Sequence, residues 1–160
     1  MITQEDLLKI IRKESATTLK AMRAFPGDKL PYTPHERSRN AGQLMTNFVF
    51  EMYLVKHYVF GEKVDRSVFQ TYAPDSSRTL IADFERETAH VVSTIEGMPE
   101  ADLNKPVEFA GKKMTADEFT LMMMFDQIHH RGQLSVYTRL AGGKVPSAYG
   151  PSADDPSTNL

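Results

Sequence analysis

An acid and an imidazole lie four residues apart late in the sequence, as Asp126 and His130 of the run DQIHH. On a helix, residues four apart share one face and lie one turn from each other. A carboxylate and an imidazole at that spacing can bind one divalent cation. The same two groups could instead satisfy each other by charge and hydrogen bonding. The spacing alone leaves both interpretations open.

The stretch that precedes this pair is almost entirely apolar, since residues 119–125 read FTLMMMF. Such a run indicates a helix facing the core, so we expect Asp126, His129 and His130 to be buried with it. Burying ionisable groups costs free energy unless they are paired or coordinate something. His129 points about 100° away from His130 on a helix. We therefore expect it to pack or cap instead of binding the same ion.

Composition limits the class of protein. The chain has 160 residues, 41% hydrophobic and 25% charged, which fits one globular domain over residues 1–160. The net charge is −2 and no basic block occurs, so we expect no nucleic-acid partner. The sequence contains no cysteine, which excludes disulfides, thiolate ligands and a cysteine nucleophile. Any metal must therefore be held by His, Asp, Glu, Asn or water.

The sequence shows no feature of membrane insertion. Its first residues, MITQED, include two acids and no apolar signal core. No stretch approaches the roughly 20 consecutive apolar residues of a membrane-spanning helix. We expect no membrane association and a cytoplasmic location.

Four segments have apolar residues at helical spacing. They cover approximately residues 3–25, 38–60, 77–97 and 115–140. Thr3 with Asp6, and Thr115 with Glu118, are typical of helix N-termini. Gly61 is placed to end the second segment. These patterns predict an all-α protein, a four-helix bundle.

The connections complete this predicted architecture. Residues 61–76 form a long crossover between the second and third helices, and residues 106–114 suggest a small hairpin before the fourth. Residues 143–160 form an extended tail. The second helix is apolar on most sides, which predicts a homodimer interface or a buried position. Gly132, inside the fourth helix, predicts a close contact with another helix.

The run His129-His130-Arg131-Gly132-Gln133-Leu134 resembles the signature of the DinB-like (DinB/YfiT-like) superfamily. The later residues Tyr137, Arg139 and the segment VPSAYGPSAD at 145–154 resemble the ending of one branch of that family. The resemblance extends over the whole chain in length and helix order, and its specific part lies within residues 126–154.

This resemblance implies a four-helix bundle, usually dimeric, with a metal-binding cavity at one end. The metal of the family is typically held by three histidines, one on the second helix and two that are four residues apart on the fourth. Some branches are thiol-dependent transferases or isomerases that use low-molecular-weight thiols, and many members have no known activity.

Two of the three ligand positions differ in this chain. His130 matches the last ligand, Asp126 stands in place of the preceding histidine, and Asn47 stands in place of the second-helix histidine. Aspartate is a competent ligand, whereas a neutral amide oxygen is a poor one for transition metals. Asn47 could therefore be a weak third ligand or could form a hydrogen bond to Asp126 or His130. Glu51 follows Asn47 by four residues and could be a substitute ligand, a general base or a supporting acid.

Other polar side chains have two interpretations each. Arg131 and Arg139 could hold an anionic substrate, but structural salt bridges are the simpler expectation. His57 and His90 are isolated histidines, and such residues are more often found at the surface or in packing than as ligands.

Two functional hypotheses follow. In the first, Asn47, Asp126 and His130 hold one divalent ion (Ni, Zn or Fe), and the protein is a metal-dependent enzyme, a thiol-linked transferase or hydrolase. In the second, the altered ligand set marks a non-catalytic bundle that binds a small molecule or a partner. The sequence identifies neither the substrate nor the metal.

Overall fold

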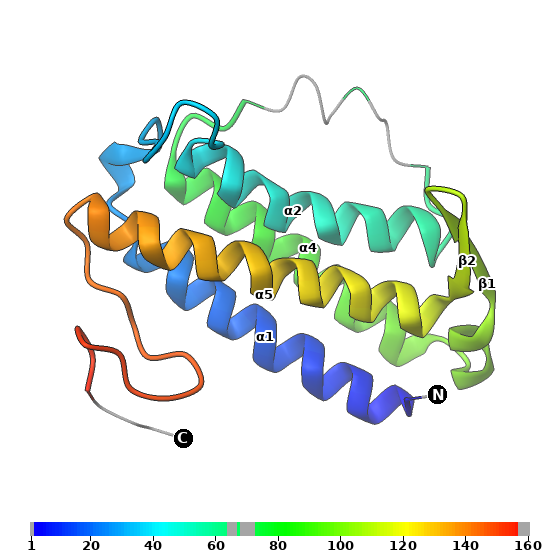
Figure 1. Ribbon diagram of the computed structural model, residues 1–160. Coiled ribbons are helices and arrows are strands. Elements are labelled where there is room, and N and C mark those ends of the chain that lie inside the picture. Colours follow the sequence, from blue (N-terminus) through cyan, green and yellow to red (C-terminus); the bar gives the residue numbers. More distant parts are fainter. Residues whose placement is uncertain (1, 64–66, 68–72, 157–160) are drawn as a thin grey trace.

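Four long helices form a bundle in the computed structural model (Figure 1), which describes residues 2–63, 67 and 73–156. The helices are α1 (Gln4–Ala24), α2 (Ala41–Tyr58), α4 (Ser77–Gly97) and α5 (Ala116–Leu140). Short 3-10 helices occupy Gly27–Lys29 and Glu100–Asn104. The predicted all-α four-helix bundle is thus confirmed.

The helices begin where side chains can satisfy their first backbone N–H groups. Thr3 accepts a hydrogen bond from the N–H of Asp6 at the start of α1, as predicted. The backbone N–H of Thr115 donates to Glu118 at 2.9 Å at the start of α5. Helix α2 begins later than the predicted Ser38, because Asn40 and Gln43 form a reciprocal capping box there.

Each helix packs mainly against two neighbours. Helix α2 lies against α4 and α5, and α1 lies against the same two helices. Figure 1 shows α2 and α4 beginning at the same end of the bundle, so the chain must return along its length between them. This agrees with the predicted long crossover, of which residues 64–66 and 68–72 lie outside the described part. The core is formed by apolar side chains from all four helices, including Leu7, Met22, Phe48, Met52, Phe84 and Phe119.

A two-stranded antiparallel hairpin precedes α5, as predicted. Strand β1 (Pro106–Phe109) pairs with β2 (Lys112–Thr115). The turn requires positive φ angles, 50° at Ala110 and 76° at Gly111. Phe109 places its ring 5.2 Å from that of Tyr58 and 5.3 Å from that of Phe119. The hairpin therefore covers the end of the α2–α5 interface.

The C-terminal tail folds back onto the bundle within its described part. The side chain of Arg139 donates to Asp154 at 2.8 Å, and Lys20 on α1 donates to the backbone oxygen of Ser147 at 3.0 Å. Val145, near the start of this tail, is buried.

One sequence-based expectation differs from the structure. A side chain placed on Gly132 would meet nothing within 4 Å, so the close helix contact predicted there is absent from the described residues. The apolar side chains of α2 are largely used within the chain, whereas Phe125, Val136 and Leu140 on α5 are strongly exposed. None of the described helices is long and apolar enough to span a membrane.

Candidate metal centre

Helices α2 and α5 bring four polar side chains to one cavity of about 700 Å³. Asn47 and Glu51 are one turn apart on α2, and Asp126 and His130 are one turn apart on α5. Because these two helices pack against each other, the i and i+4 positions of one face those of the other. The rest of the lining is mainly apolar, with Phe50, Leu54, Tyr58 and Phe109.

Three of these residues could hold a metal ion. Glu51, Asp126 and His130 each offer one ligand atom, and these atoms all lie within 4.8 Å of one another. Nε2 of His130 is 3.5 Å from Oδ2 of Asp126. Two carboxylate oxygens and an imidazole nitrogen are suitable ligands for a divalent cation.

Glu51 is the most unusual member of this cluster. Its side chain is buried, with 3% of the residue exposed, and neither carboxylate oxygen has a hydrogen-bond partner among the described residues. Burial raises the pKa of Glu51 well above its usual value, and the nearby carboxylate of Asp126 raises it further. A buried acid without partners is costly. A cation at this position would remove that cost, so the donor set fits a metal.

Asn47 controls the chemistry of His130. Its side-chain oxygen accepts a hydrogen bond from Nη1 of Arg39 at 2.6 Å, which turns its amide nitrogen towards Nε2 of His130, 3.3 Å away. Nε2 must therefore accept, and Nδ1 carries the proton, which it can donate to Gln133 Oε1 at 3.1 Å. This is the tautomer that a metal requires, and the Nε2 lone pair, which here accepts from Asn47, would become available to a cation once the Asn47 amide moved aside or turned over.

The cluster is less buried than predicted. The side chain of Asp126 is 48% exposed and that of His130 18% exposed. Asp126 lies at the cavity edge because its helical position is on the side of α5 between α2 and solvent, next to the exposed Phe125. His129 is also exposed and contacts Gln133 at 3.0 Å. The expectation that all three ionisable groups would be buried is wrong, since Asp126 and His129 are exposed and His130 is partly buried.

The arginines of the signature have structural partners. Arg131 is buried and donates to the carboxylate of Glu14 at 2.7 Å. Arg139 is paired with Asp154 at 2.8 Å. These contacts agree with the structural salt bridges expected for both residues.

The isolated histidines lie elsewhere. His57 contacts the backbone oxygen of Glu62 at 2.9 Å, and Nε2 of His90 lies 2.6 Å from the carboxylate of the same residue. Neither residue lines the cavity of the cluster.

The metal ligands predicted from the sequence were Asn47, Asp126 and His130, with Glu51 only as a possible substitute. The signal that could have identified it was its spacing of four from Asn47, which places both residues on the face of α2 that meets Asp126 and His130. Nothing in the sequence alone shows that Glu51 would be buried without partners while Asp126 would be partly exposed.

This fold and site define a class of protein. The sequence matches the DinB family over residues 1–159, and the chain belongs to that family.

Known proteins of the same class include several from Bacillus. The chain is 25% identical over 118 residues to the uncharacterised protein YjoA of Bacillus subtilis. The matched region covers 72% of this chain and 75% of YjoA. The crystal structure of a DinB-like protein from Bacillus cereus superposes with a TM-score of 0.82 at 23% identity, covering 92% of this chain and 98% of that one. YfiT from Bacillus subtilis superposes with a TM-score of 0.68 at 8% identity, covering 89% and 91%. At these identities the two structures establish the fold.

Proposed function

We propose that the protein is a metal-dependent enzyme that binds one divalent ion between α2 and α5. The observation that carries this proposal is the buried, unpartnered carboxylate of Glu51 beside Asp126 and His130. YfiT, which shares the fold, is described as a probable metal-dependent hydrolase. Hydrolysis is accordingly the reaction class that we put first, and a thiol-linked transfer is the second.

Glu51, Asp126 and His130 supply the three ligand atoms in this proposal. Asn47, the third ligand predicted from the sequence, also belongs to the site. In the observed orientation, the amide nitrogen of Asn47 contacts His130 and orients its ring. If the amide group turned over, its oxygen would face the ion and could be a further ligand. The set contains more oxygen than the three histidines of the family resemblance. It therefore suits Zn²⁺, Fe²⁺ or Mn²⁺ better than a metal that prefers nitrogen ligands, such as Ni²⁺.

A bound divalent ion would supply a Lewis acid that polarises a carbonyl group or lowers the pKa of a water molecule. The side chains of the cavity have distinct parts in such a reaction. The carboxylate of Asp126 is partly exposed at the cavity edge, where it can reach a substrate group as well as an ion. Phe50, Leu54 and Phe109 form an apolar wall that excludes water from one side of a bound substrate.

Isothermal titration of untagged, chelator-free protein with Zn²⁺ and Mn²⁺ tests the site. We expect saturation at one ion per chain, and Glu51→Gln should weaken binding at least about tenfold, because a buried ligand charge is lost. Glu85→Gln is the matched control, since it removes an exposed acid that pairs with Arg23. Absence of saturable binding, or equal affinities for the wild type and Glu51→Gln, would refute the metal site.

A non-catalytic bundle that binds a small molecule is the alternative, and it is favoured by the altered ligand set, in which Asn47 and Asp126 stand where the family resemblance places histidines. A panel of carboxylic esters and amides assayed with the Zn²⁺-loaded protein separates the two. Turnover that Glu51→Gln abolishes supports the enzyme, and tight metal binding without any turnover on the panel supports the alternative.

We also propose that the protein is a homodimer, with α5 in the interface. Phe125, Val136 and Leu140 are 63%, 55% and 58% exposed, an unusual density of large apolar side chains for one helix. Gly132 lies on the same exposed face with open space before it, so a helix of a second copy could approach closely there.

A further inference from the structure

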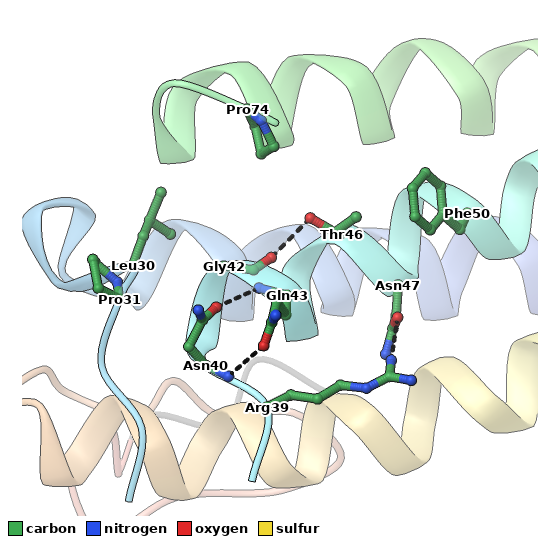
Figure 2. A pocket seen from close by; sticks show the side chains of 10 residues that line it. All are labelled: Leu30, Pro31, Arg39, Asn40, Gly42, Gln43, Thr46, Asn47, Phe50 and Pro74. Atoms are coloured by element: carbon green, nitrogen blue, oxygen red, sulfur yellow. Dashed lines mark hydrogen bonds between the residues drawn. The ribbon is translucent and has the colours of Figure 1, made fainter. Parts of the chain in front are cut away.

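Arg39 lies immediately before α2, at the wall that separates the cavity of the cluster from a second hollow. Figure 2 shows this second hollow, of about 690 Å³, with the side chain of Arg39 extending to Asn47. Arg39, Asn47 and Phe50 line both spaces. The guanidinium is therefore accessible from the space that contains Glu51, Asp126 and His130.

The charge of Arg39 has no acidic partner in the described part of the chain. Its one side-chain hydrogen bond there goes to the neutral oxygen of Asn47. The arginines of the family signature are different, because Arg131 pairs with Glu14 and Arg139 pairs with Asp154. A guanidinium has five N–H donors in a planar fork that matches a carboxylate. Most of these donors remain free for a ligand.

The backbone around Arg39 is fixed. The hydroxyl of Tyr137 on α5 donates to the backbone oxygen of Arg39 at 3.1 Å. The next residue, Asn40, forms the capping box of α2. Asn47 then holds the guanidinium at the cavity wall. A cation that is held in this way can orient a ligand at low entropic cost.

The remaining surroundings indicate the kind of ligand. Phe50, Leu54, Tyr58 and Phe109 give the cavity an apolar side large enough for an aromatic or branched aliphatic group. The carboxylate of Asp126 also lines this cavity, so a doubly charged phosphate would be repelled more strongly than a singly charged carboxylate.

We propose that Arg39 binds the carboxylate of a small monoanionic substrate with an apolar body, whose reacting group lies beside Glu51, Asp126 and His130. This inference rests on the proposed function for the reacting end and adds the substrate class. Arg39 is then a specificity-determining residue, because it distinguishes a carboxylate from the corresponding neutral amide.

A matched pair of probes tests the proposal, 3-phenylpropanoate and its neutral amide. Binding is measured by ligand-observed NMR and titration calorimetry, with the protein metal-free and Zn²⁺-loaded. We expect the carboxylate to bind more tightly than the amide. Arg39→Gln should reduce the ratio of the two affinities about tenfold, since a hydrogen bond to a charged group contributes about that factor to binding. Arg39→Lys should retain part of it. Arg12→Gln, which removes an exposed arginine paired with Glu96 on α1 and α4, should retain all of it.

The outcomes separate this inference from the metal site. If Zn²⁺ binds but the two probes bind equally, or Arg39→Gln behaves like Arg12→Gln, the anion site is refuted and the metal site stands. If Zn²⁺ does not bind but an Arg39-dependent preference remains, the metal proposal fails and the anion site stands. Tighter binding of 3-phenylpropylphosphonate than of the carboxylate would refute the stated substrate class, as would no binding of either probe at about 10 mM. Circular dichroism checks that each variant is folded.

Discussion

The amide nitrogen of Asn47 lies 3.3 Å from Nε2 of His130, where α2 packs against α5. The orientation of this amide depends on Arg39, which bonds to its oxygen. Nε2 of His130 is therefore held as an acceptor beside the carboxyl groups of Glu51 and Asp126. The contacts between Arg39, Asn47 and His130 thus favour the tautomer of His130 that is protonated on Nδ1.

Restoring the histidine that the family resemblance places on the second helix should strengthen the metal site. Asn47→His would add an imidazole beside His130, and we expect Zn²⁺ and Ni²⁺ to bind at least about tenfold more tightly, with a larger gain for Ni²⁺. Competition titration against a chromogenic chelator measures both affinities. Lys13→His, which adds an exposed histidine on α1, is the control. An unchanged affinity for both metals would show that position 47 does not face the ion.

Removing the buried acid should separate stability from metal binding. Glu51→Gln replaces a carboxyl group whose charged form loses its hydration on folding, so the metal-free variant should be more stable than the wild type above the raised pKa of Glu51, by about 1 kcal/mol or roughly 2–4 °C in Tm. Added Zn²⁺ should raise the Tm of the wild type and leave that of the variant unchanged. Thermal scans with and without Zn²⁺ measure both effects, and a variant that Zn²⁺ stabilises as much as the wild type would contradict the assignment.

The raised pKa of Glu51 also predicts that the stability of the metal-free protein and its affinity for metal change in opposite directions with pH. Its pKa in the folded protein is raised above the unfolded value, so its contribution to stability is fully present below the unfolded pKa and is lost as pH rises through the raised value. The metal-free protein should therefore lose stability over that range. Metal binding needs the carboxylate and releases its proton, so affinity should rise over the same range. Urea unfolding and metal titration across pH 5–9 follow the two trends, and Glu51→Gln should flatten the first.

Asp126 should matter for metal binding more than for folding. Its side chain is 48% exposed and lies 3.5 Å from His130, so solvent screens the interaction between the two side chains. We expect Asp126→Ala to cost less than about 1 kcal/mol in the metal-free protein but to abolish stabilisation by Zn²⁺. A large loss of metal-free stability would instead indicate that the pair is structural. Asp102→Ala, at a partly exposed ion pair with Lys105, is the comparison.

The fold was predictable because its determinants are local. Helical spacing of apolar residues, the capping residues at Thr3 and Thr115 and the turn at Ala110 and Gly111 each act within a few positions of the chain. Their agreement predicted the helices, the hairpin and the long crossover.

The site was predictable only in part, because its details depend on contacts between helices. The i, i+4 spacings identified Asp126 with His130, and Asn47 with Glu51. Which carboxylate is buried and which is exposed depends on how α5 is rotated against α2, and no local pattern encodes that rotation. The contact of Arg39 with Asn47 depends in the same way on the path of the loop before α2. The open space at Gly132 also shows that a glycine within a helix does not by itself establish a close contact with another helix of the same chain.

Two adjacent residues of the signature should have different roles, because Arg131 faces α1 while His130 faces α2. We expect Arg131 to stabilise the fold and His130 to bind the metal. Arg131 is buried and bonds to Glu14, to Thr18 and to the hydroxyl of Tyr149 in the tail. Arg131→Leu would leave the charge of Glu14 buried without a cationic partner, with the hydroxyl of Tyr149 as its remaining donor, and we expect a loss of about 3–5 kcal/mol.

The double variant Glu14→Leu with Arg131→Leu removes both charges and should recover much of that loss, since apolar pairs often replace buried ion pairs at little cost. Zn²⁺ affinity, measured below the Tm of each variant, should stay within about twofold of the wild type, because neither side chain lines the cavity of Glu51. Chemical denaturation and metal titration on the single and double variants measure the two quantities. A large change in Zn²⁺ affinity in the double variant would show that the α1–α5 contact and the metal centre are coupled through α5.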